Sequence, residues 1–209
     1  MNKPATLHEV PHAALGTLHI TSPLAKESAA SLRAGQFVSI SGTLVTARDR
    51  AHEFLLSEKV PAGLGELLHC GILYHCGPIV KKEGGRFRVI AAGPTTSARF
   101  GMYAPRLIKR YGISAVMGKG GMGALGVPYL SAIGGAAALL ANRVTLVEKV
   151  YMLPQFGMPE AIWVLRVDAF PALVTADTHG GSIHEKVIKH SKEIYKEAIS
   201  DGCENSPRR

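Results

Sequence analysis

From Leu18 onward, apolar residues recur in short blocks whose spacing alternates between the period of a strand and that of a helix. Alternating or fully apolar blocks predict strands over residues 36–45 (with a bulge at Gly42), 71–80, 86–92, 113–117, 129–133, 144–147, 162–167 and 172–175. Helical spacing predicts helices over residues 25–33, 47–60, 97–110 and 183–199, and a buried helix of small residues that ends at Ala141. Because strands alternate with helices, we expect an α/β fold: one domain on a mixed, partly parallel sheet with flanking helices.

The two ends of the chain have weaker patterns than its middle. Residues 1–17 show little periodicity and are expected to form an N-terminal extension, and residues 201–209 form a polar tail. Between them we find no internal repeat and no linker, so residues 18–200 are expected to form a single domain. Within that domain, the Lys-Lys-Glu-Gly-Gly segment at residues 81–85 predicts the turn of a β-hairpin.

Composition places the chain among ordinary globular proteins, since 46% of its 209 residues are hydrophobic and 19% are charged. Its longest weakly polar stretch, residues 132–141, is too short for a membrane helix, which needs roughly 20 residues. Polar residues at positions 8, 9 and 12 argue against an export signal. Three cysteines make no disulfide framework and fit a reducing compartment. We therefore expect a cytoplasmic protein without a membrane segment.

Two of the three cysteines, Cys70 and Cys76, lie close together in the sequence, but their spacing fits neither a zinc knuckle nor a redox Cys-x-x-Cys motif. Small buried cysteines are the commoner outcome. We expect no metal ligands on this chain.

The formal net charge of +8 calls for an anionic partner of some kind. Nucleic-acid-binding proteins are often this basic, but here the lysines and arginines are scattered, and no aromatic residues are interleaved with them as a stacking platform would require. An anionic small substrate or an acidic partner chain explains the charge at least as well, and we expect no nucleic acid.

The segment Gly-Pro-Thr-Thr-Ser-Ala-Arg at residues 93–99 is the most informative in the chain. It follows an apolar block, so we expect a turn from a strand into a helix, with Gly93 and Pro94 at the bend. Either Thr95 or Thr96 can cap the helix, whose free N–H groups would point toward the same space. Arg99, one turn later, adds a planar guanidinium that matches a carboxylate or phosphate. The sequence therefore predicts an anion-binding turn.

A second candidate is the glycine-rich segment at residues 118–123, where Gly118, Gly120 and Gly123 satisfy the dinucleotide pattern G-x-G-x-x-G. The pattern lies in mid-chain, contains Lys119, and is followed near the end of the next long strand by Glu148 as its only acid. Binding of a nicotinamide dinucleotide is therefore a remote alternative. A P-loop is excluded because no Gly-Lys-Ser/Thr occurs at the right spacing. A loop that brings backbone N–H groups and one ammonium close to an anion is the better interpretation.

Three cations, Arg48, Arg99 and Lys119, each follow a predicted strand end. Alone, each has an ordinary explanation, and Arg48 could simply pair with Asp49. Because ligands of α/β sheets bind beyond strand ends, we expect the three to converge. His52 and His75 lie beside apolar residues and are interpreted as structural.

Five motifs occur in order: GTLVTARDRAH at residues 42–52, HCGP at 75–78, GPTTSAR at 93–99, GKGGM at 118–122 and GMPEAIW at 157–163. Over roughly residues 18–180 the chain resembles the β subunit of class I iron–sulfur hydro-lyases, a family of two-subunit fumarate hydratases with L-tartrate dehydratase as a close relative. The resemblance implies a swivelling β/β/α domain that closes over a partner α subunit. That subunit would hold a four-iron–four-sulfur cluster through three cysteines, with none bound by this chain alone.

The resemblance also implies an activity and residue roles. The reaction is the reversible hydration of fumarate to S-malate, and the alternative is the dehydration of L-tartrate to oxaloacetate. Arg48, Arg99 and Lys119 match carboxylate-binding cations, Thr96 matches a hydrogen-bond donor to the substrate, and Thr95 matches a catalytic, proton-transferring threonine. A threonine hydroxyl is a poor base, so Thr95 would need a basic neighbour or a cation beside its alkoxide. The partners implied are the α subunit and a dicarboxylate, and an isolated chain could form homodimers through the surface meant for that subunit.

Overall fold

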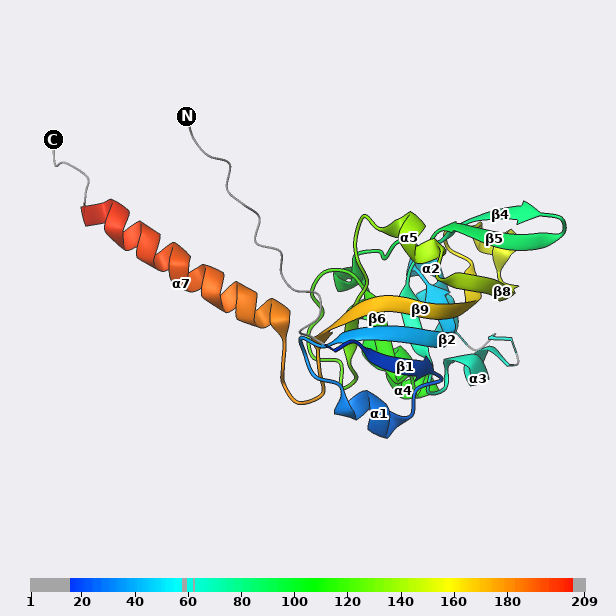
Figure 1. The fold of residues 1–209 in the computed structure, drawn as a ribbon, viewed down its shortest axis with the longest axis horizontal. Helices are drawn as coiled ribbons and strands as arrows, with labels where there is room; N and C mark the ends of the chain where they lie inside the picture. Colours follow the sequence, from blue (N-terminus) through cyan, green and yellow to red (C-terminus); the bar gives the residue numbers. More distant parts are fainter. Residues whose placement is uncertain (1–15, 58–59, 62, 205–209) are drawn as a thin grey trace, which may run out of the picture.

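The computed structural model describes residues 16–57, 60–61 and 63–204. Within these residues, one seven-stranded sheet carries the segments that are predicted to bind an anion. A separate β-hairpin extends from the sheet, and short helices pack around both (Figure 1). The sheet has the order β1 (Leu18–Ser22), β2 (Phe37–Ala47), β3 (Ile72–His75), β6 (Ala115–Gly118), β7 (Tyr129–Ser131), β9 (Ile162–Ala176) and β8 (Val144–Tyr151). The hairpin consists of β4 (Ile79–Glu83) and β5 (Arg86–Ala91).

The helices are short, apart from the last. They are α1 (Lys26–Ser31), α2 (Asp49–Leu55), α3 (Leu64–Leu68), the 3₁₀ helix η1 (Ser97–Phe100), α4 (Ala104–Tyr111), α5 (Ala137–Ala141), α6 (Leu153–Phe156) and α7 (Ile183–Glu204). The expected α/β architecture, a single domain with a mixed sheet and flanking helices, is confirmed.

The sheet is mixed and closes on itself. Strands β1, β2, β3, β6 and β7 run parallel to their neighbours, whereas β9 pairs antiparallel with β7, β8 and also β2. The pairing of β2 with β9, between residues 37–45 and residues 164–173, joins the two halves of the sheet. Because β2, β3 and β6 are parallel neighbours, the residues that follow them emerge at one edge, where ligands of α/β sheets bind.

Two apolar cores lie on opposite faces of the strands. In β9, Trp163 and Leu165 belong to one core and Ile162 to the other, as the two-residue period of a strand requires. Aromatic side chains fill the first core: the rings of Tyr74 and Phe170 meet edge to face at 5.6 Å. These cores hold the strand ends at the site in fixed positions.

Several local predictions are confirmed. Strand β2 has its register shift between Ile40 and Gly42, where the bulge was expected, and Gly42 has a φ of +104°. The hairpin turns at Gly84 and Gly85, both with positive φ. Helix α4 ends at Gly112, which takes the left-handed conformation typical of a helix C-terminus.

Other boundaries were wrong. The strand expected over residues 71–80 is two strands in different sheets, because the chain leaves the main sheet at residues 76–78. The helix expected over 97–110 is broken into η1 and α4, and Pro105 starts the second helix, where a missing N–H costs nothing. Helix α2 covers only seven of the residues expected over 47–60. The two strands expected over 162–175 form one continuous strand, β9.

The small-residue helix that was expected to be buried is also wrong. Helix α5 starts only at Ala137, and it is only partly buried: Leu140 and Ala141 belong to the core, whereas Leu139 is 57% exposed. Strand β1 and helices α3 and α6 were not predicted.

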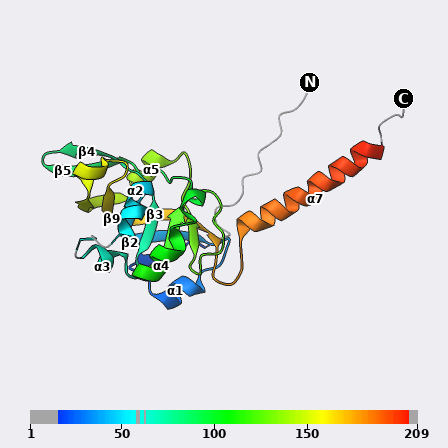
Figure 2. The ribbon, with the colours of Figure 1, turned by 180° about the vertical axis from the view of Figure 1, so that it is seen from behind.

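Helix α7 extends away from the body of the domain and runs to Glu204, past the expected end at residue 199 (Figures 1 and 2). Apolar side chains along it are exposed, among them Val187, Ile188, Ile194 and Tyr195. Within the described ranges, no helix is both long and apolar enough to cross a membrane. The expected N-terminal extension lies outside the described residues, apart from positions 16 and 17.

Candidate active site

An open pocket of about 480 Å³ lies at the edge where β2, β3 and β6 end. Its lining contains all five residues singled out from the sequence, together with a proline and two glycines: Arg48, Gly77, Gly93, Pro94, Thr95, Thr96, Arg99 and Lys119. Three cations from separate segments therefore face one space, as expected from their positions after strand ends.

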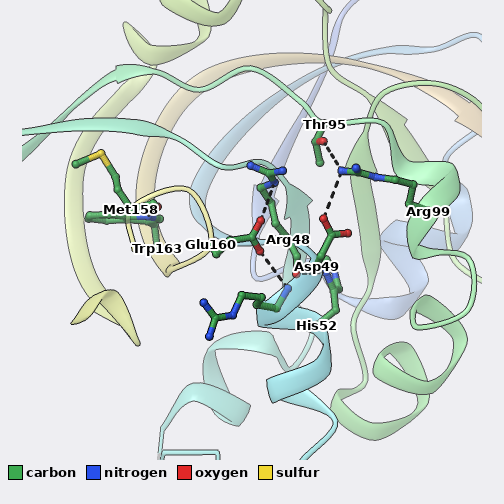
Figure 3. Close-up of polar contacts among 9 residues, drawn as sticks. Arg48, Asp49, His52, Thr95, Arg99, Met158, Glu160 and Trp163 are labelled. Carbon is green, nitrogen blue, oxygen red and sulfur yellow. Dashed lines mark hydrogen bonds and ion pairs between the residues drawn. The ribbon is translucent and has the colours of Figure 1, made fainter. Parts of the chain in front are cut away.

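Arg48 follows β2 directly and occupies the N-cap position of α2. Its Nε lies 3.4 Å from Oε1 of Glu160, and the other carboxylate oxygen of Glu160 accepts the backbone N–H of Arg50 at 3.0 Å (Figure 3). Glu160 is thus fixed to the first turn of α2 and holds the Arg48 side chain in place. The alternative considered for Arg48, a simple pairing with Asp49, is not found, because its acidic partner is Glu160.

Gly77 explains how Arg48 can pass this close to the loop after β3. A Cβ at position 77 would lie 2.5 Å from Cδ of Arg48 and 2.5 Å from the carbonyl oxygen of Pro159. Only glycine leaves this space open. The loop therefore forms part of the wall against which the guanidinium is held.

Arg99 lies on η1, on the other side of the pocket from Arg48. Its Nη2 donates to Oγ1 of Thr95 at 3.3 Å and lies 3.5 Å from Oδ2 of Asp49 (Figure 3). A cation beside a hydroxyl favours the deprotonated oxygen over the neutral one. The sequence left open what could activate Thr95, and the structure places a guanidinium beside it.

The turn that carries Thr95 and Thr96 is bonded to the loop after β6. The backbone N–H of Ser97 donates to the carbonyl of Lys119 at 3.0 Å, and the N–H of Lys119 donates to the carbonyl of Thr95 at 3.3 Å. Thr96 and Lys119 form a parallel bridge. The two predicted anion-binding segments are therefore adjacent and share one backbone network.

One expectation about this turn was wrong. Thr96 is the N-cap of η1, but neither its hydroxyl nor that of Thr95 caps the helix, and the Ser97 N–H is already bonded to Lys119. The capacity of the pocket for an anion comes from side-chain cations and not from a helix N-terminus.

The glycine pattern at 118–123 does not sit in a dinucleotide-binding arrangement. Strand β6 ends at Gly118, and the chain continues through a loop to β7 without a helix. A dinucleotide pyrophosphate binds at the N-terminus of a helix that starts in the glycine loop. The loop instead presents Lys119 to the pocket.

The two histidines near the site are buried and neutral. Burial lowers the pKa of His52 to about 4 and holds the pKa of His75 well below its usual range. Their rings pack against Phe100 at centroid distances of 4.3 and 4.1 Å. Neither lines the pocket, in agreement with their interpretation as structural residues.

No role in the site was expected for Glu160 or Gly77, and Asp49 was considered only as a partner of Arg48, although all three belong to the quoted motifs. A signal for Glu160 was present, because it is an acid directly before an apolar strand block. Its partner could not be read from the sequence, since Arg48 is more than a hundred positions away.

Among the described residues, Cys70 and Cys76 do not belong to a metal or cluster site. Cys70 and Cys76 are free thiols, and burial raises the pKa of Cys76 to about 12. Across the part of the chain that the structure describes, no three His, Cys, Asp or Glu side chains gather closely enough to hold a metal ion.

Residues 4–187 match the family model described as "Fumarase C-terminus". A protein from Geobacillus stearothermophilus named "Putative fumarate hydratase class I" is 45% identical over 183 residues, which cover 83% of this chain and 35% of that protein. The chain therefore spans about a third of that relative's length.

Two further relatives have nearly the same length as the matched region. "Putative L(+)-tartrate dehydratase subunit beta" of Methanocaldococcus jannaschii is 45% identical over 190 residues, covering 84% of this chain and 95% of the relative. "L(+)-tartrate dehydratase subunit beta" of Escherichia coli K12 is 36% identical over 199 residues, covering 89% and 96%.

Proposed function

Since the chain belongs to the fumarase C-terminus family, we propose that it is the β subunit of a two-subunit hydro-lyase that reversibly hydrates fumarate to S-malate. The observation that carries the proposal is the convergence of Arg48, Arg99 and Lys119 on one pocket with Thr95 and Thr96. Fumarate is a small dianion, and each charge-assisted hydrogen bond to a carboxylate contributes about 1.5–3 kcal/mol.

Each pocket side chain has a role in the proposal. Arg48 and Lys119 bind the dicarboxylate from separate loops, and Arg99 with Thr96 binds it from the turn. Loss of a proton from malate leaves negative charge that spreads onto the adjacent carboxylate. Cations already in place around that carboxylate stabilise this charge without reorganisation. Thr95, with Arg99 Nη2 at 3.3 Å, exchanges the proton at the substrate carbon.

The described residues do not fit an iron–sulfur cluster, because no three metal-ligating side chains gather among them, and Cys76 is buried with a raised pKa. We therefore assign the four-iron–four-sulfur cluster to the α subunit, where one iron would act as a Lewis acid on the substrate hydroxyl. The contribution of this chain is to bind the dicarboxylate and move the proton. The free thiols suit the reducing cytoplasm as its compartment.

Dehydration of L-tartrate is a second candidate function. It is supported by the names of two relatives, 45% and 36% identical to this chain, that are called L(+)-tartrate dehydratase subunit beta. The same cations would bind either dicarboxylate.

The test is anaerobic reconstitution with the α subunit, followed by assays with fumarate, S-malate and both enantiomers of tartrate. We expect turnover of fumarate and malate by the complex, and a colourless, inactive β chain alone. Turnover of L-tartrate only would select the second candidate. A complex that turns over none of them, or a β chain that binds iron stoichiometrically by itself, would contradict the proposal.

A further inference from the structure

A buried polar pair lies directly behind the turn that carries Thr95 and Thr96. Nδ1 of His75 lies 2.9 Å from Oγ of Ser97, and both side chains are fully buried. An imidazole and a hydroxyl taken out of water cost stability unless they bond to each other or to the backbone. The pair therefore forms a specific link between β3 and η1.

His75 holds the turn at two points. Its backbone carbonyl accepts the N–H of Thr95 at 2.7 Å, and its side chain bonds to Ser97, two residues further along. Thr96 lies between these two attachments and forms the bridge to Lys119. A displacement of His75 would thus be transmitted to both threonines and to the lysine.

The surroundings leave the Ser97 hydroxyl little freedom. A Cβ at Gly118 would overlap Ser97 Oγ and would lie 3.1 Å from the hydroxyl of Tyr129. The absence of a side chain at Gly118 therefore lets Ser97 reach beneath the backbone that leads into Lys119. Position 118 is a glycine for this close approach and not for its backbone angles, since it has no positive φ.

The imidazole of His75 is itself held by rings. His52 meets it edge to face at 4.9 Å, and Phe100 packs on it at 4.1 Å. Its Nε2 is buried and has no hydrogen-bond partner in the described part of the chain. The hydrogen bond to Ser97 is therefore the polar contact of the His75 imidazole within the described part of the chain. Burial keeps this imidazole neutral and separate from the pocket.

We propose that His75 is a positioning residue of the site, which acts through Ser97 to fix Thr95 and Thr96 against Lys119. This inference rests on the proposed function only where it is tested by the kinetics of the reconstituted complex. Thr95 must lie within hydrogen-bond reach of the proton that it exchanges, and a small misplacement of a reacting group is costly in rate. No proton passes through His75 in this role.

Two variants separate positioning from a merely structural role. His75→Asn keeps a polar atom near the place of Nδ1, whereas His75→Leu keeps apolar volume and loses the bond. A structural role predicts that activity follows stability, so that the leucine variant is at least as active as the asparagine variant. Positioning predicts the opposite order: in the reconstituted complex, His75→Leu lowers kcat at least ten-fold, and His75→Asn stays within about three-fold of wild type.

Ser97→Ala should reproduce the loss of kcat without a large cavity. Its matched control is Ser22→Ala, which removes another buried, hydrogen-bonded serine from β1, a strand that contributes nothing to the pocket. The control should lower the melting temperature but leave kcat unchanged. Wild-type kcat in both His75→Leu and Ser97→Ala would overturn the inference.

Amide hydrogen exchange, measured on the full chain, tests the positioning role without depending on enzymatic activity. In His75→Leu the Ser97 amide, which is bonded to Lys119, should exchange at least ten-fold faster, with no such change in His75→Asn. If the wild-type complex hydrates no dicarboxylate, the proposed function fails, and the exchange result alone decides the positioning role. Unchanged exchange at Ser97 in His75→Leu overturns that role.

Discussion

One nitrogen of Arg99, Nη2, lies 3.3 Å from the hydroxyl of Thr95 and also faces the carboxylate of Asp49 at 3.5 Å. The guanidinium therefore keeps a positive charge beside the Thr95 hydroxyl. Its planar group has further N–H donors whose hydrogen bonds a ligand carboxylate can accept. Asp49 is thus the acidic partner of Arg99 in the structure, and we expect a substrate carboxylate to compete with it for the guanidinium.

Removal of Arg99 should therefore abolish most of the activity. We expect Arg99→Ala to lower kcat/KM of the reconstituted complex at least about 100-fold, and Arg99→Lys to recover only part of it, because an ammonium lacks the planar pair of N–H donors that binds a carboxylate in a bidentate manner. Arg106→Ala, a surface arginine on α4 outside the pocket, is the matched control and should behave as wild type. Near-normal turnover by Arg99→Ala would contradict a role of Arg99 in substrate binding.

Removal of the Asp49 carboxylate, which competes with the substrate for Arg99, should strengthen substrate binding. The Arg99–Asp49 pair is half-exposed, and such pairs contribute about 0.2–1 kcal/mol. Asp49→Asn should therefore lower KM for the dicarboxylate, by up to about five-fold, with kcat little changed. Glu53→Gln, which alters another acid of α2, should leave KM as it is. An increase of KM in Asp49→Asn would mean that the aspartate orients Arg99 and does not compete with substrate.

A methyl group at Gly77 should act on binding through Arg48. Because the added Cβ would lie 2.5 Å from Arg48 Cδ and from the Pro159 carbonyl, either the guanidinium or the loop must move. We expect Gly77→Ala to raise KM about ten-fold. Gly123→Ala is the control, since a Cβ there meets nothing within 4 Å. Equal KM values for both variants would show that the site does not depend on the close approach of Arg48.

The sequence was sufficient to identify the five pocket residues, because each lies in a motif next to a strand end. Arg48 and Lys119 follow β2 and β6, which run parallel on either side of β3, so their convergence follows from strand order and direction. Local chemistry also located the hairpin turn correctly, at Gly84 and Gly85, where a positive φ selects glycine.

What the sequence did not reveal depends on tertiary contacts. The apolar pattern of residues 71–80 is the same whether they form one strand or two, and only the exit at Gly77 separates β3 from β4. The contacts of Arg48 with Glu160 and of His75 with Ser97 join segments 112 and 22 positions apart. No local signal specifies such partners.

Acid should destabilise the fold through the buried histidines. Burial lowers the pKa of His52 from 6.5 to about 4, so between these values the unfolded chain binds a proton that the folded chain does not. Stability rises with pH wherever the unfolded state holds more protons; it is therefore complete above pH 6.5 and falls as the pH drops toward 4. His75, with its lowered pKa, contributes in the same direction. Urea unfolding at pH 7 and 5.5 should show wild type losing about 1 kcal/mol more than His52→Gln. Equal losses in the two proteins would show that His52 is not held neutral by the fold.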